Sequence, residues 1–274
     1  MTNKVAVVTG GGGILCGELA KTLAKNGAKV AVLDLKKEAA DNLAAEINSA
    51  GGTAIGVAAN VLDKEALEAA HREVLKELGP CEILINGAGG NHPKGTTSME
   101  HFSPDQLDKA DLTSFFDLDH EGVEFVFNLN FLGTLIPTQV FSKDMIGKDD
   151  CSIINISSMN AFTPLTKIPA YSGAKAAVSN FTQWLAVHFA KVGIRVNALA
   201  PGFFLTDQNR SLLTKEDGSM TERGNKIISQ TPMGRYGKPE DLNSTLLWLC
   251  DPATSFVTGI VVPIDGGFSA YSGV

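Results

Sequence analysis

Short runs of apolar, β-branched residues alternate along the chain with longer segments in which apolar residues recur every three or four positions. The runs have the length of strands, and the segments have the spacing of amphipathic helices. Because the runs are almost continuously apolar, both faces of each strand are expected to be covered. The predicted strands are residues 5–9, 29–34, 54–58, 83–86, 152–157, 195–199 and 259–263.

Helices are predicted in the segments that lie among these strands. Their expected ranges are 17–26, 38–50, 64–78, 130–146, 170–192 and 240–249. Repeated strand–helix units with right-handed crossovers build a parallel sheet that is covered on both sides. The pattern therefore predicts an α/β protein: a doubly wound, Rossmann-type three-layer sandwich with a seven-stranded parallel sheet, in a single domain that spans residues 1–274.

Two stretches interrupt the alternation. Residues 91–124 are polar, acidic and aromatic by turns, and they are much longer than a usual strand–helix connection. Residues 203–231 are rich in Asp, Asn, Ser, Thr and Gly, and they follow a strand end, where open α/β sheets bind ligands. We expect an insertion and a substrate loop at these positions, with surface decoration or a subunit contact as the alternative.

The composition narrows the class of protein. Hydrophobic residues make up 44% of the 274 residues and charged residues 19%, which suits a large core and excludes an intrinsically disordered chain. The 23 Lys and Arg residues against 30 Asp and Glu residues give a formal charge of −7. Because no surplus of basic side chains is present to bind phosphates, we expect no nucleic-acid partner.

The apolar stretches also exclude a membrane span. The longest, such as residues 5–8 and 30–33, fall far short of the roughly 20 residues that a spanning helix needs. The N-terminus enters the first strand without the order of regions that marks a signal peptide, so a cytoplasmic location is expected. Without C-x-x-C spacing, the cysteines are predicted to be free, buried thiols: Cys16, Cys81, Cys151 and Cys250.

A glycine run connects the first strand to the first helix. Gly10 to Gly13 can form a tight turn whose backbone N–H groups approach a pyrophosphate at the helix N-terminus. Asp34 ends the second strand, where its carboxylate can accept hydrogen bonds from both hydroxyls of an adenosine ribose. NAD is favoured over NADP because the carboxylate would repel a 2′-phosphate, although Lys36 and Lys37 could partly offset this repulsion. The alternative for Asp34 is a turn residue at a strand end.

Tyr171 and Lys175 are four residues apart and share one face of a predicted helix. A neighbouring ammonium is expected to lower the pKa of a tyrosine from its usual value near roughly 10. The polar end of the strand over residues 152–157 is expected beside the start of this helix. The two residues make a plausible proton-transfer pair, and a contact on the helix surface is the alternative.

Further short motifs occur in a characteristic order. They are Thr9-Gly10, Asn60-Val61, Asn86-Gly87-Ala88-Gly89, Asn128-Leu129-Asn130, Ser157-Ser158, Tyr171-x-x-x-Lys175, Pro201-Gly202 and Asp265-Gly266-Gly267. With this set the chain resembles the short-chain dehydrogenase/reductase family over essentially its whole length outside the insertion. The resemblance implies an NAD(P)-dependent enzyme that acts on CH–OH donors.

The resemblance also implies site residues. Ser158 lies 13 residues before Tyr171, as the family's catalytic serine does, and Asn130 takes the place of its catalytic asparagine. The implied catalytic residues are Asn130, Ser158, Tyr171 and Lys175. Cofactor contacts are expected from Gly10, Gly12, Gly13, Ile14, Leu15, Asp34, Asn60, Val61, Asn86, Ala88, Gly89, Pro201 and Gly202, together with Tyr171 and Lys175.

In the family mechanism, Lys175 would hydrogen-bond the nicotinamide ribose and hold Tyr171 near its anionic state. Tyr171 would take the proton of the substrate hydroxyl as hydride passes to NAD, while Ser158 holds the reacting oxygen. Asn130 would fix a water that links Lys175 to solvent. A polar side chain that only bends its helix is the alternative for Asn130.

Several positions depart from the family pattern. Ile14 and Cys16 occupy the second and third glycine positions of the family's turn, so Gly12, Gly13 and Gly17 would have to supply the turn and the close helix packing. At two further positions Asn60 replaces a common aspartate, and Gly87 replaces the second asparagine of the N-N-A-G motif.

The glycine run, the 86–94 segment and the insertion together resemble the D-mannonate oxidoreductase (fructuronate reductase) branch of the family. Asn91, His92 and Lys94 follow the fourth strand, where polar donors could meet a hydroxylated, anionic sugar acid alongside Ser158 and Tyr171. Lys94 is the first candidate for the partner of the substrate carboxylate. Arg210 in the 203–231 loop is the second, and loop capping is the alternative for His92 and Lys94.

Other functions stay open at this point. The substrate could instead be gluconate, another polyol or a 3-oxoacyl group, and a non-catalytic dinucleotide-binding protein is a further alternative. The resemblance implies a homodimer or homotetramer, with Leu246, Leu247, Leu249 and residues 261–263 at the contact. No metal site is expected, because the histidines and aspartates of the insertion lack a compact ligand spacing: His92, His101, His120, Asp117 and Asp119.

Overall fold

The protein is built on one all-parallel sheet. The computed structural model describes residues 1–107, 109–206 and 209–273, and within them seven strands pair in the order β3-β2-β1-β4-β5-β6-β7. The strands are β1 (Val5–Thr9), β2 (Lys29–Asp34), β3 (Thr53–Ala58), β4 (Ile83–Asn86), β5 (Cys151–Ile156), β6 (Ile194–Pro201) and β7 (Val261–Ile264). The order reverses between β1 and β4, where doubly wound sheets bind their ligands. The predicted doubly wound α/β architecture is confirmed.

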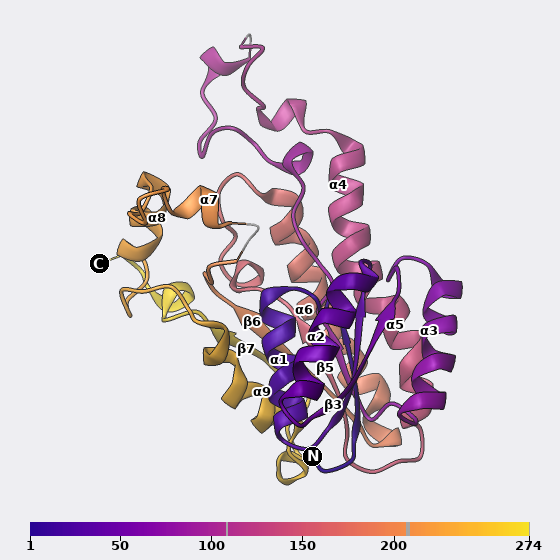
Figure 1. The fold of residues 1–274 in the computed structure, drawn as a ribbon. Helices are drawn as coiled ribbons and strands as arrows, with labels where there is room; N and C mark the ends of the chain where they lie inside the picture. Colours follow the sequence, from indigo (N-terminus) through magenta and orange to yellow (C-terminus); the bar gives the residue numbers. More distant parts are fainter. Residues whose placement is uncertain (108, 207–208, 274) are drawn as a thin grey trace.

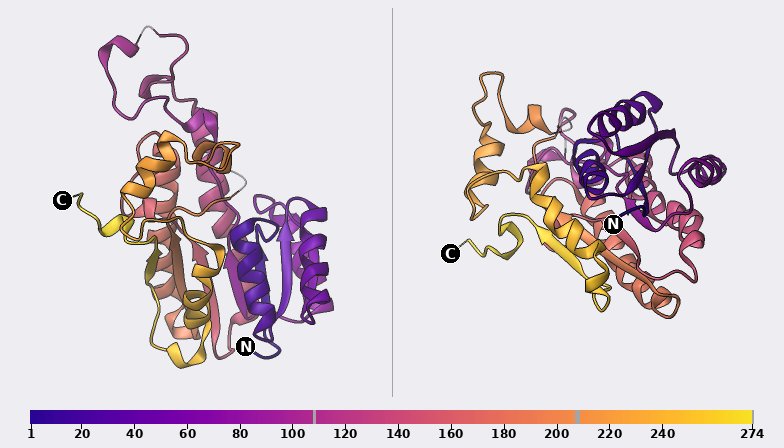
Figure 2. Two further views of the ribbon diagram at one scale, coloured as in Figure 1. Left: turned by 60° about the vertical axis from the view of Figure 1, so that its left-hand side comes forward. Right: turned by 60° about the horizontal axis from the view of Figure 1, so that its bottom comes forward.

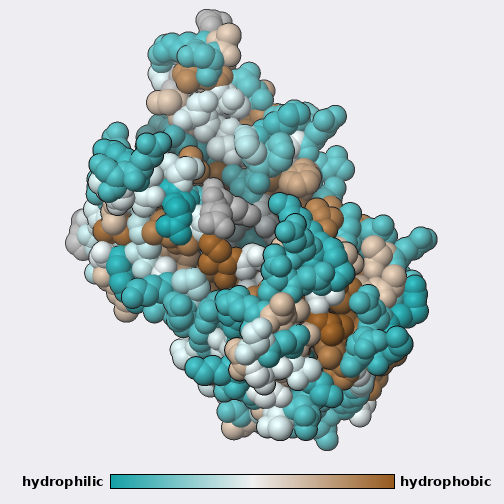
Figure 3. All heavy atoms as spheres, viewed as in Figure 1, coloured by the Kyte–Doolittle hydropathy of each residue, from teal (hydrophilic) through white to brown (hydrophobic). Residues whose placement is uncertain are grey.

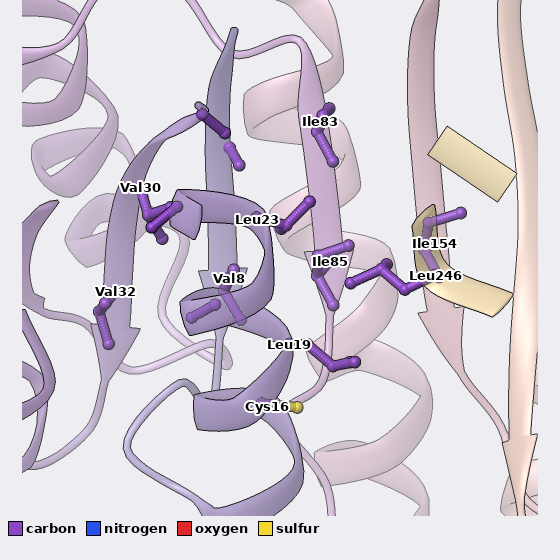
Figure 4. Close-up of a cluster of buried hydrophobic side chains, with 14 of the residues drawn as sticks. Val8, Cys16, Leu19, Leu23, Val30, Val32, Ile83, Ile85, Ile154 and Leu246 are labelled. Atoms are coloured by element: carbon purple, nitrogen blue, oxygen red, sulfur yellow. The ribbon is translucent and has the colours of Figure 1, made fainter. Parts of the chain in front are cut away.

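Helices cover both faces of the sheet and complete the three layers (Figures 1 and 2). One face packs against α1 (Ile14–Lys25), α2 (Lys37–Ser49) and α9 (Asn243–Cys250). The other packs against α3 (Lys64–Glu77), α5 (Gly133–Phe141) and α6 (Pro169–Phe189). Figure 4 shows the first of these cores, in which Cys16, Leu19 and Leu23 of α1 lie against the strands. All four cysteines are buried and free, as predicted.

The strand register brings the chemically important loops to one edge. Thr9 at the end of β1 pairs with Leu33 of β2 and with Asn86 of β4, and Asn86 pairs in turn with Asn155 of β5. The segments that follow these strands therefore leave the sheet side by side. The glycine run, Asp34, the 86–94 segment and Ser158 all belong to this edge.

The helix predicted over residues 130–146 begins earlier than expected. It starts as α4 (His120–Phe127), passes through a π-helical turn (Asn128–Leu132) and continues as α5, which ends before a 3-10 turn at Ser142–Met145. The Asp119 side chain caps α4 by accepting the N–H groups of Glu121 and Gly122. The aromatic residues read as part of an insertion thus belong partly to a helix.

Other boundaries shift by smaller amounts. Helix α1 begins at Ile14 rather than at 17. Helix α6 ends at Phe189 and α9 begins at Asn243, because 3-10 turns occupy the residues after α6 and before α9. The 203–231 loop contains two short helices, α7 (Arg210–Leu213) and α8 (Glu222–Ser229). Position 108 of the insertion, positions 207–208 of the loop and residue 274 lie outside the described residues.

The insertion projects from the body of the molecule, above α4 in Figure 1 and at the top of the left-hand view of Figure 2. Figure 3 shows mainly hydrophilic side chains over the insertion and the α8 segment, with apolar side chains gathered in smaller areas. No helix in the described part of the chain is long and apolar enough to cross a membrane. Leu246 and Leu249, expected at a subunit contact, are instead buried inside this chain.

Candidate active site

Helix α6 presents Tyr171 and Lys175 from its first two turns. It begins at Pro169, a residue that suits the first turn because it has no N–H to leave unpaired. Lys175 is only 4% exposed, and its Nζ donates to the Ile156 carbonyl at 2.7 Å. The same Nζ lies 5.7 Å from the centre of the Tyr171 ring, which keeps part of its surface exposed. The two predicted residues therefore meet at the end of β5.

Burial controls the ionisation of both groups. It raises the pKa of Tyr171, with a hydrogen bond from Ser158 acting in the opposite direction, and it lowers the pKa of Lys175 to about 8. The expectation that the pKa of Tyr171 lies below its usual value is therefore wrong. The reason is that desolvation by burial opposes charge on both side chains.

Ser158 comes from the segment that follows β5. It is 7% exposed and caps a 3-10 turn, where its Oγ accepts the N–H of Asn160 at 3.3 Å. The neighbouring Ser157 turns inward and bonds to Ser179 of α6. This arrangement holds the end of β5 against α6, so that Ser158 reaches Tyr171.

Asn130 occupies the π-helical turn between α4 and α5. Such turns often occur at functional sites, because the extra residue redirects a side chain. Its amide nitrogen donates to the carbonyls of Val126 at 2.7 Å and Gly90 at 2.8 Å, and its amide oxygen accepts the Gly90 N–H at 3.2 Å. The Asn130 side chain therefore clamps the segment after β4.

Gly89 marks the point where Asn130 and Lys175 converge. A Cβ atom at position 89 would lie 2.6 Å from Asn130 Oδ1 and 3.2 Å from Lys175 Nζ. Only a residue without a side chain leaves these groups in place. The fold thus assembles the four predicted catalytic residues from β5, α6 and the π-helical turn.

The glycine run forms a cradle beside Asp34. Gly10 adopts φ +63°, in the left-handed region that glycine favours, and a Cβ there would lie 2.9 Å from Ala88 Cα. The Asp34 carboxylate accepts the N–H groups of Gly12 at 3.1 Å and Lys36 at 3.0 Å. A dinucleotide fits this arrangement, because backbone amides and a fixed carboxylate lie at the N-terminus of α1.

The glycine positions carry different roles from those expected. The left-handed turn is made by Gly10 rather than by Gly12 or Gly13, and Gly13 serves as the N-cap of α1. Gly17 does provide close packing, since a Cβ there would lie 3.2 Å from the Gly11 carbonyl oxygen.

Two departures from the family pattern are linked in space. A Cβ at Gly87 would lie 2.1 Å from Cys16 Sγ. The thiol of Cys16 therefore fills the space that a side chain at position 87 would need. A large residue at one of these positions requires a small one at the other, which the sequence could not show because 71 residues separate them.

Gly87→Ala should therefore destabilise the fold by about 1–3 kcal/mol, the usual cost of an overpacked core. Adding Cys16→Gly should restore part of that loss, although Cys16→Gly alone weakens α1. Denaturant unfolding of the two single variants and the double variant gives the coupling energy. Additive effects in this cycle would show that the two sites relax independently.

The remaining predicted cofactor residues occupy varied positions. Ile14 and Leu15 begin α1 and are partly buried, and Asn60 caps the turn after β3 by accepting the Leu62 N–H. Val61 packs against Gly133, since a Cβ atom on Gly133 would lie 3.1 Å from Val61 Cγ2. Pro201 ends β6, and a Cβ on the following Gly202 would lie 2.6 Å from Asp265 Cα.

Asn86 belongs to the sheet interior. It is 1% exposed, and its amide nitrogen donates to Thr138 Oγ1 and Asn155 Oδ1, both at 2.9 Å. Asn155 donates in turn to Thr182 of α6 at 2.9 Å. The Asn86 side chain is thus engaged between α5 and β5 rather than presented at the sheet edge. Asn155, an amide inside an apolar strand, was the signal for this network that the sequence analysis missed.

The predicted substrate residues lie at the base of the insertion. Asn91 donates to Thr96 Oγ1 at 3.0 Å, and His92 Nδ1 accepts the Lys94 N–H at 3.2 Å. The Lys94 ammonium forms an ion pair with Asp119 at 3.0 Å, and this contact raises the pKa of Lys94. Lys94 is therefore already neutralised by a neighbour, which weakens its case as the partner of a substrate carboxylate.

The base of the insertion nevertheless lies close to the catalytic helix. A Cβ on Gly95 would come within 3.5 Å of Ala170 Cβ, next to Tyr171. A cavity of about 490 Å³ opens at the same place, lined by Phe115, Phe116, Leu118, His120, Val123, Phe127, Pro169 and Ala170. Among the described residues, no group of three or more His, Cys, Asp or Glu side chains is placed to bind a metal ion.

Comparison with known proteins identifies the family. The model of the short chain dehydrogenase family matches residues 4–217. The chain is a short-chain dehydrogenase. It is therefore an oxidoreductase of the NAD(P)-dependent class that acts on CH–OH groups.

This short-chain dehydrogenase has close relatives over its whole length. An uncharacterized oxidoreductase from Haemophilus influenzae is 59% identical, with 100% of this chain and 96% of the relative aligned. An uncharacterized oxidoreductase, UxuB, from Bacillus subtilis is 53% identical, with 100% and 98% aligned. A crystal structure from Haemophilus influenza, provisionally named a D-mannonate oxidoreductase and containing bound NAD, is 57% identical with a TM-score of 0.95, covering 100% of this chain and 98% of that chain.

Proposed function

We propose that this short-chain dehydrogenase uses NAD to interconvert a hydroxyl and a ketone on a sugar acid, with D-mannonate and D-fructuronate as the pair. The observation that carries the chemistry is the meeting of Ser158, Tyr171 and Lys175 at the sheet edge that also holds the Asp34 cradle. The substrate is supported by the name of the Haemophilus structure, which matches this chain over its full length. The preference for NAD rests on Asp34 and on the NAD bound in that relative.

The cofactor site is formed by the glycine cradle and the carboxylate of Asp34, with Lys175 at the nicotinamide end. When bound there, NAD supplies the acceptor for the hydride that leaves the carbinol carbon. Gly12 and Gly13 are exposed at the start of α1, where the Gly12 N–H donates to Asp34 and the Gly13 N–H donates to the Gly10 carbonyl. A pyrophosphate at this helix N-terminus would take over the Gly12 N–H from Asp34. The Asp34 oxygens would then exchange part of their backbone hydrogen bonds for the ribose hydroxyls.

The catalytic residues divide the remaining work. Ser158 holds the reacting oxygen by a hydrogen bond, and Tyr171 takes its proton during oxidation or returns it during reduction. Lys175 supplies a positive charge that stabilises the phenolate while the proton is transferred. Asn130 holds the segment after β4 through its hydrogen bonds to Gly90, and this keeps the Gly89 backbone close to Lys175.

A turnover assay tests the proposed function directly. Purified protein should oxidise D-mannonate with NAD and reduce D-fructuronate with NADH, followed at the absorbance of the reduced nicotinamide. Gluconate, neutral polyols and a 3-oxoacyl substrate are the comparison set. A higher kcat/KM for any of these than for D-mannonate would replace the substrate, and no turnover of any would favour a non-catalytic dinucleotide-binding protein.

The cofactor preference depends on one side chain. Asp34→Ala should lower kcat/KM with NAD and raise it with NADP, because the variant loses the ribose acceptor and the charge that repels the 2′-phosphate. Lys37 is engaged with Asp41 and with the Gly56 carbonyl, so it offers little competition. The ratio of kcat/KM for the two cofactors is the measurement. A wild-type preference for NADP would contradict this role of Asp34.

The assembly and location are also part of the proposal. We expect one catalytic unit over residues 1–274, working in the cytoplasm as a homodimer or homotetramer. Trp184 and Trp248 are 56% and 44% exposed in this chain. Exposed tryptophans on α6 and α9 support subunit contacts through these helices.

A further inference from the structure

A sugar acid presents its charge far from the atom that reacts. In D-mannonate, the carbon that is oxidised to give D-fructuronate lies four bonds from the carboxylate carbon, a span of about 5 Å in an extended chain. The partner of the carboxylate must therefore lie away from the hydroxyl of Tyr171, on the segments that border the substrate. This inference rests on the proposed function and concerns the same site.

Lys167 is the first cation on such a segment. It lies on the connection that runs from Ser158 to Tyr171, and its backbone adopts φ +73°, a conformation that residues other than glycine rarely adopt. Its carbonyl accepts the N–H of Thr97 at 2.8 Å, so the insertion holds this part of the connection in place. A lysine kept in a strained conformation four residues before Tyr171 points to a functional side chain.

The Lys167 ammonium is also available. It is partly buried, and within the described ranges no hydrogen bond or ion pair engages it. Lys94, by contrast, is paired with Asp119, a carboxylate that also caps α4 and so is held in place beside it. Arg210, the second candidate from the sequence, is exposed at the start of the four-residue helix α7.

Lys226 adds a second cation from the opposite loop. Its Nζ pairs with Glu100 Oε2 at 2.5 Å, which joins α8 of the 203–231 loop to the insertion across 126 residues of sequence. Lys226 and Lys167 both help to hold the pKa of Glu100 below its usual value. Glu100 is thus a carboxylate of the protein itself that pairs with Lys226 and feels the charge of Lys167.

We propose that Lys167 and Lys226 bind the carboxylate of the substrate, and that Glu100 occupies this place while no substrate is bound. Lys226 and Lys167 carry two positive charges against the one negative charge of Glu100, and a monoanionic sugar acid neutralises the charge that remains. The 91–124 insertion and the 203–231 loop thereby select acids over neutral polyols.

The test replaces each charge separately. Lys167→Met and Lys226→Met should each raise the KM for D-mannonate about tenfold to a hundredfold while leaving the KM for NAD unchanged. Lys167→Arg should keep most of the wild-type affinity, because the charge is retained. Lys215→Met is the matched control, since Lys215 is an exposed lysine of the same loop. Calorimetric titration of D-mannonate into the NADH complex gives an independent measure of affinity.

Glu100→Gln distinguishes a site that binds the substrate carboxylate from an ion pair that only joins the two loops. If Glu100 competes with the substrate, its removal should lower the KM for D-mannonate by roughly twofold to tenfold. If the Glu100–Lys226 pair only ties the two loops together, Glu100→Gln should raise the KM as Lys226→Met does.

The outcomes distinguish a failure of the proposed function from a failure of the carboxylate site alone. Absence of turnover with D-mannonate, D-fructuronate and gluconate in the wild type would overturn the proposed function and this inference with it. Turnover of a sugar acid with an unchanged KM in both lysine variants, or with a raised KM in Glu100→Gln, would overturn only the assignment of the carboxylate site.

Discussion

Tyr171→Phe should reduce turnover by about 10²–10⁴-fold while the protein folds and binds NAD as before. The substitution removes one hydroxyl, and a positioned acid/base group contributes a rate factor of this size. The ring of Tyr171 packs beside the buried Ala170 and Ala174, and phenylalanine preserves that packing. Steady-state assays with the proposed sugar acid measure the rate, and fluorescence titration with NADH measures cofactor binding.

The pH profile gives a second view of the same residue. Because burial raises the pKa of Tyr171 above its ordinary value, the phenolate stays a minor form at neutral pH, and its fraction grows as the pH rises into the alkaline range. Oxidation of the alcohol in the wild type should therefore accelerate as pH rises, and the Phe variant should lose this dependence. A Tyr171→Phe protein with near-native kcat at any pH would remove Tyr171 from the mechanism.

Lys175→Met should abolish most of the activity and yet raise the free energy of unfolding at neutral pH. A buried ammonium is costly, which is why the pKa of Lys175 falls to about 8 from 10.5. Methionine has similar length and no charge, so it avoids this cost. The positive charge beside the Tyr171 ring is lost, and we expect turnover to fall by at least about 10²-fold.

The stability difference should depend on pH with a definite sign. Between about pH 8 and 10.5 the unfolded chain retains a proton on Lys175 that the folded protein has released, so folding becomes more favourable as pH rises. From pH 7 to pH 9.5, wild type should gain roughly 2 kcal/mol of unfolding free energy relative to Lys175→Met. Urea unfolding of both proteins at the two pH values measures this. A constant difference across the range would mean that Lys175 keeps its normal pKa in the fold.

Much of the architecture follows from local sequence. The strands Val5–Thr9, Lys29–Asp34 and Ile83–Asn86 have the predicted bounds, because each is a continuous apolar run between polar or glycine residues. The spacing of Tyr171 and Lys175 was enough to place them on one helix face. The motif order was enough to predict the family. These features depend on neighbouring residues along the chain, which is the information that a sequence pattern contains.

Helix bounds near the site were less predictable. The sequence placed the start of a helix at Asn130, whereas α4 begins at His120 and continues through the π-helical turn. That turn is stabilised by the bonds of Asn130 to Gly90, a residue on a different segment. A local pattern does not contain such a contact, so it could not show where the helix starts.

The electrostatics of the site depend on the tertiary structure. From spacing alone, Lys175 should lower the pKa of Tyr171, but burial raises that pKa instead. Lys94 likewise has the right position in the sequence and is neutralised by Asp119. Desolvation and pairing depend on what surrounds a side chain in three dimensions.

The sequence by itself determined the class of chemistry, because the residue types that transfer a proton and bind a dinucleotide occur in a recognisable order. Only the tertiary structure decided which distant residues share space. Cys16 fills the position that a side chain at Gly87 would need, and Lys226 meets Glu100 across the two loops. Such pairings arise from the packing of elements far apart in the chain, where van der Waals volume and charge are matched between partners that no local pattern connects.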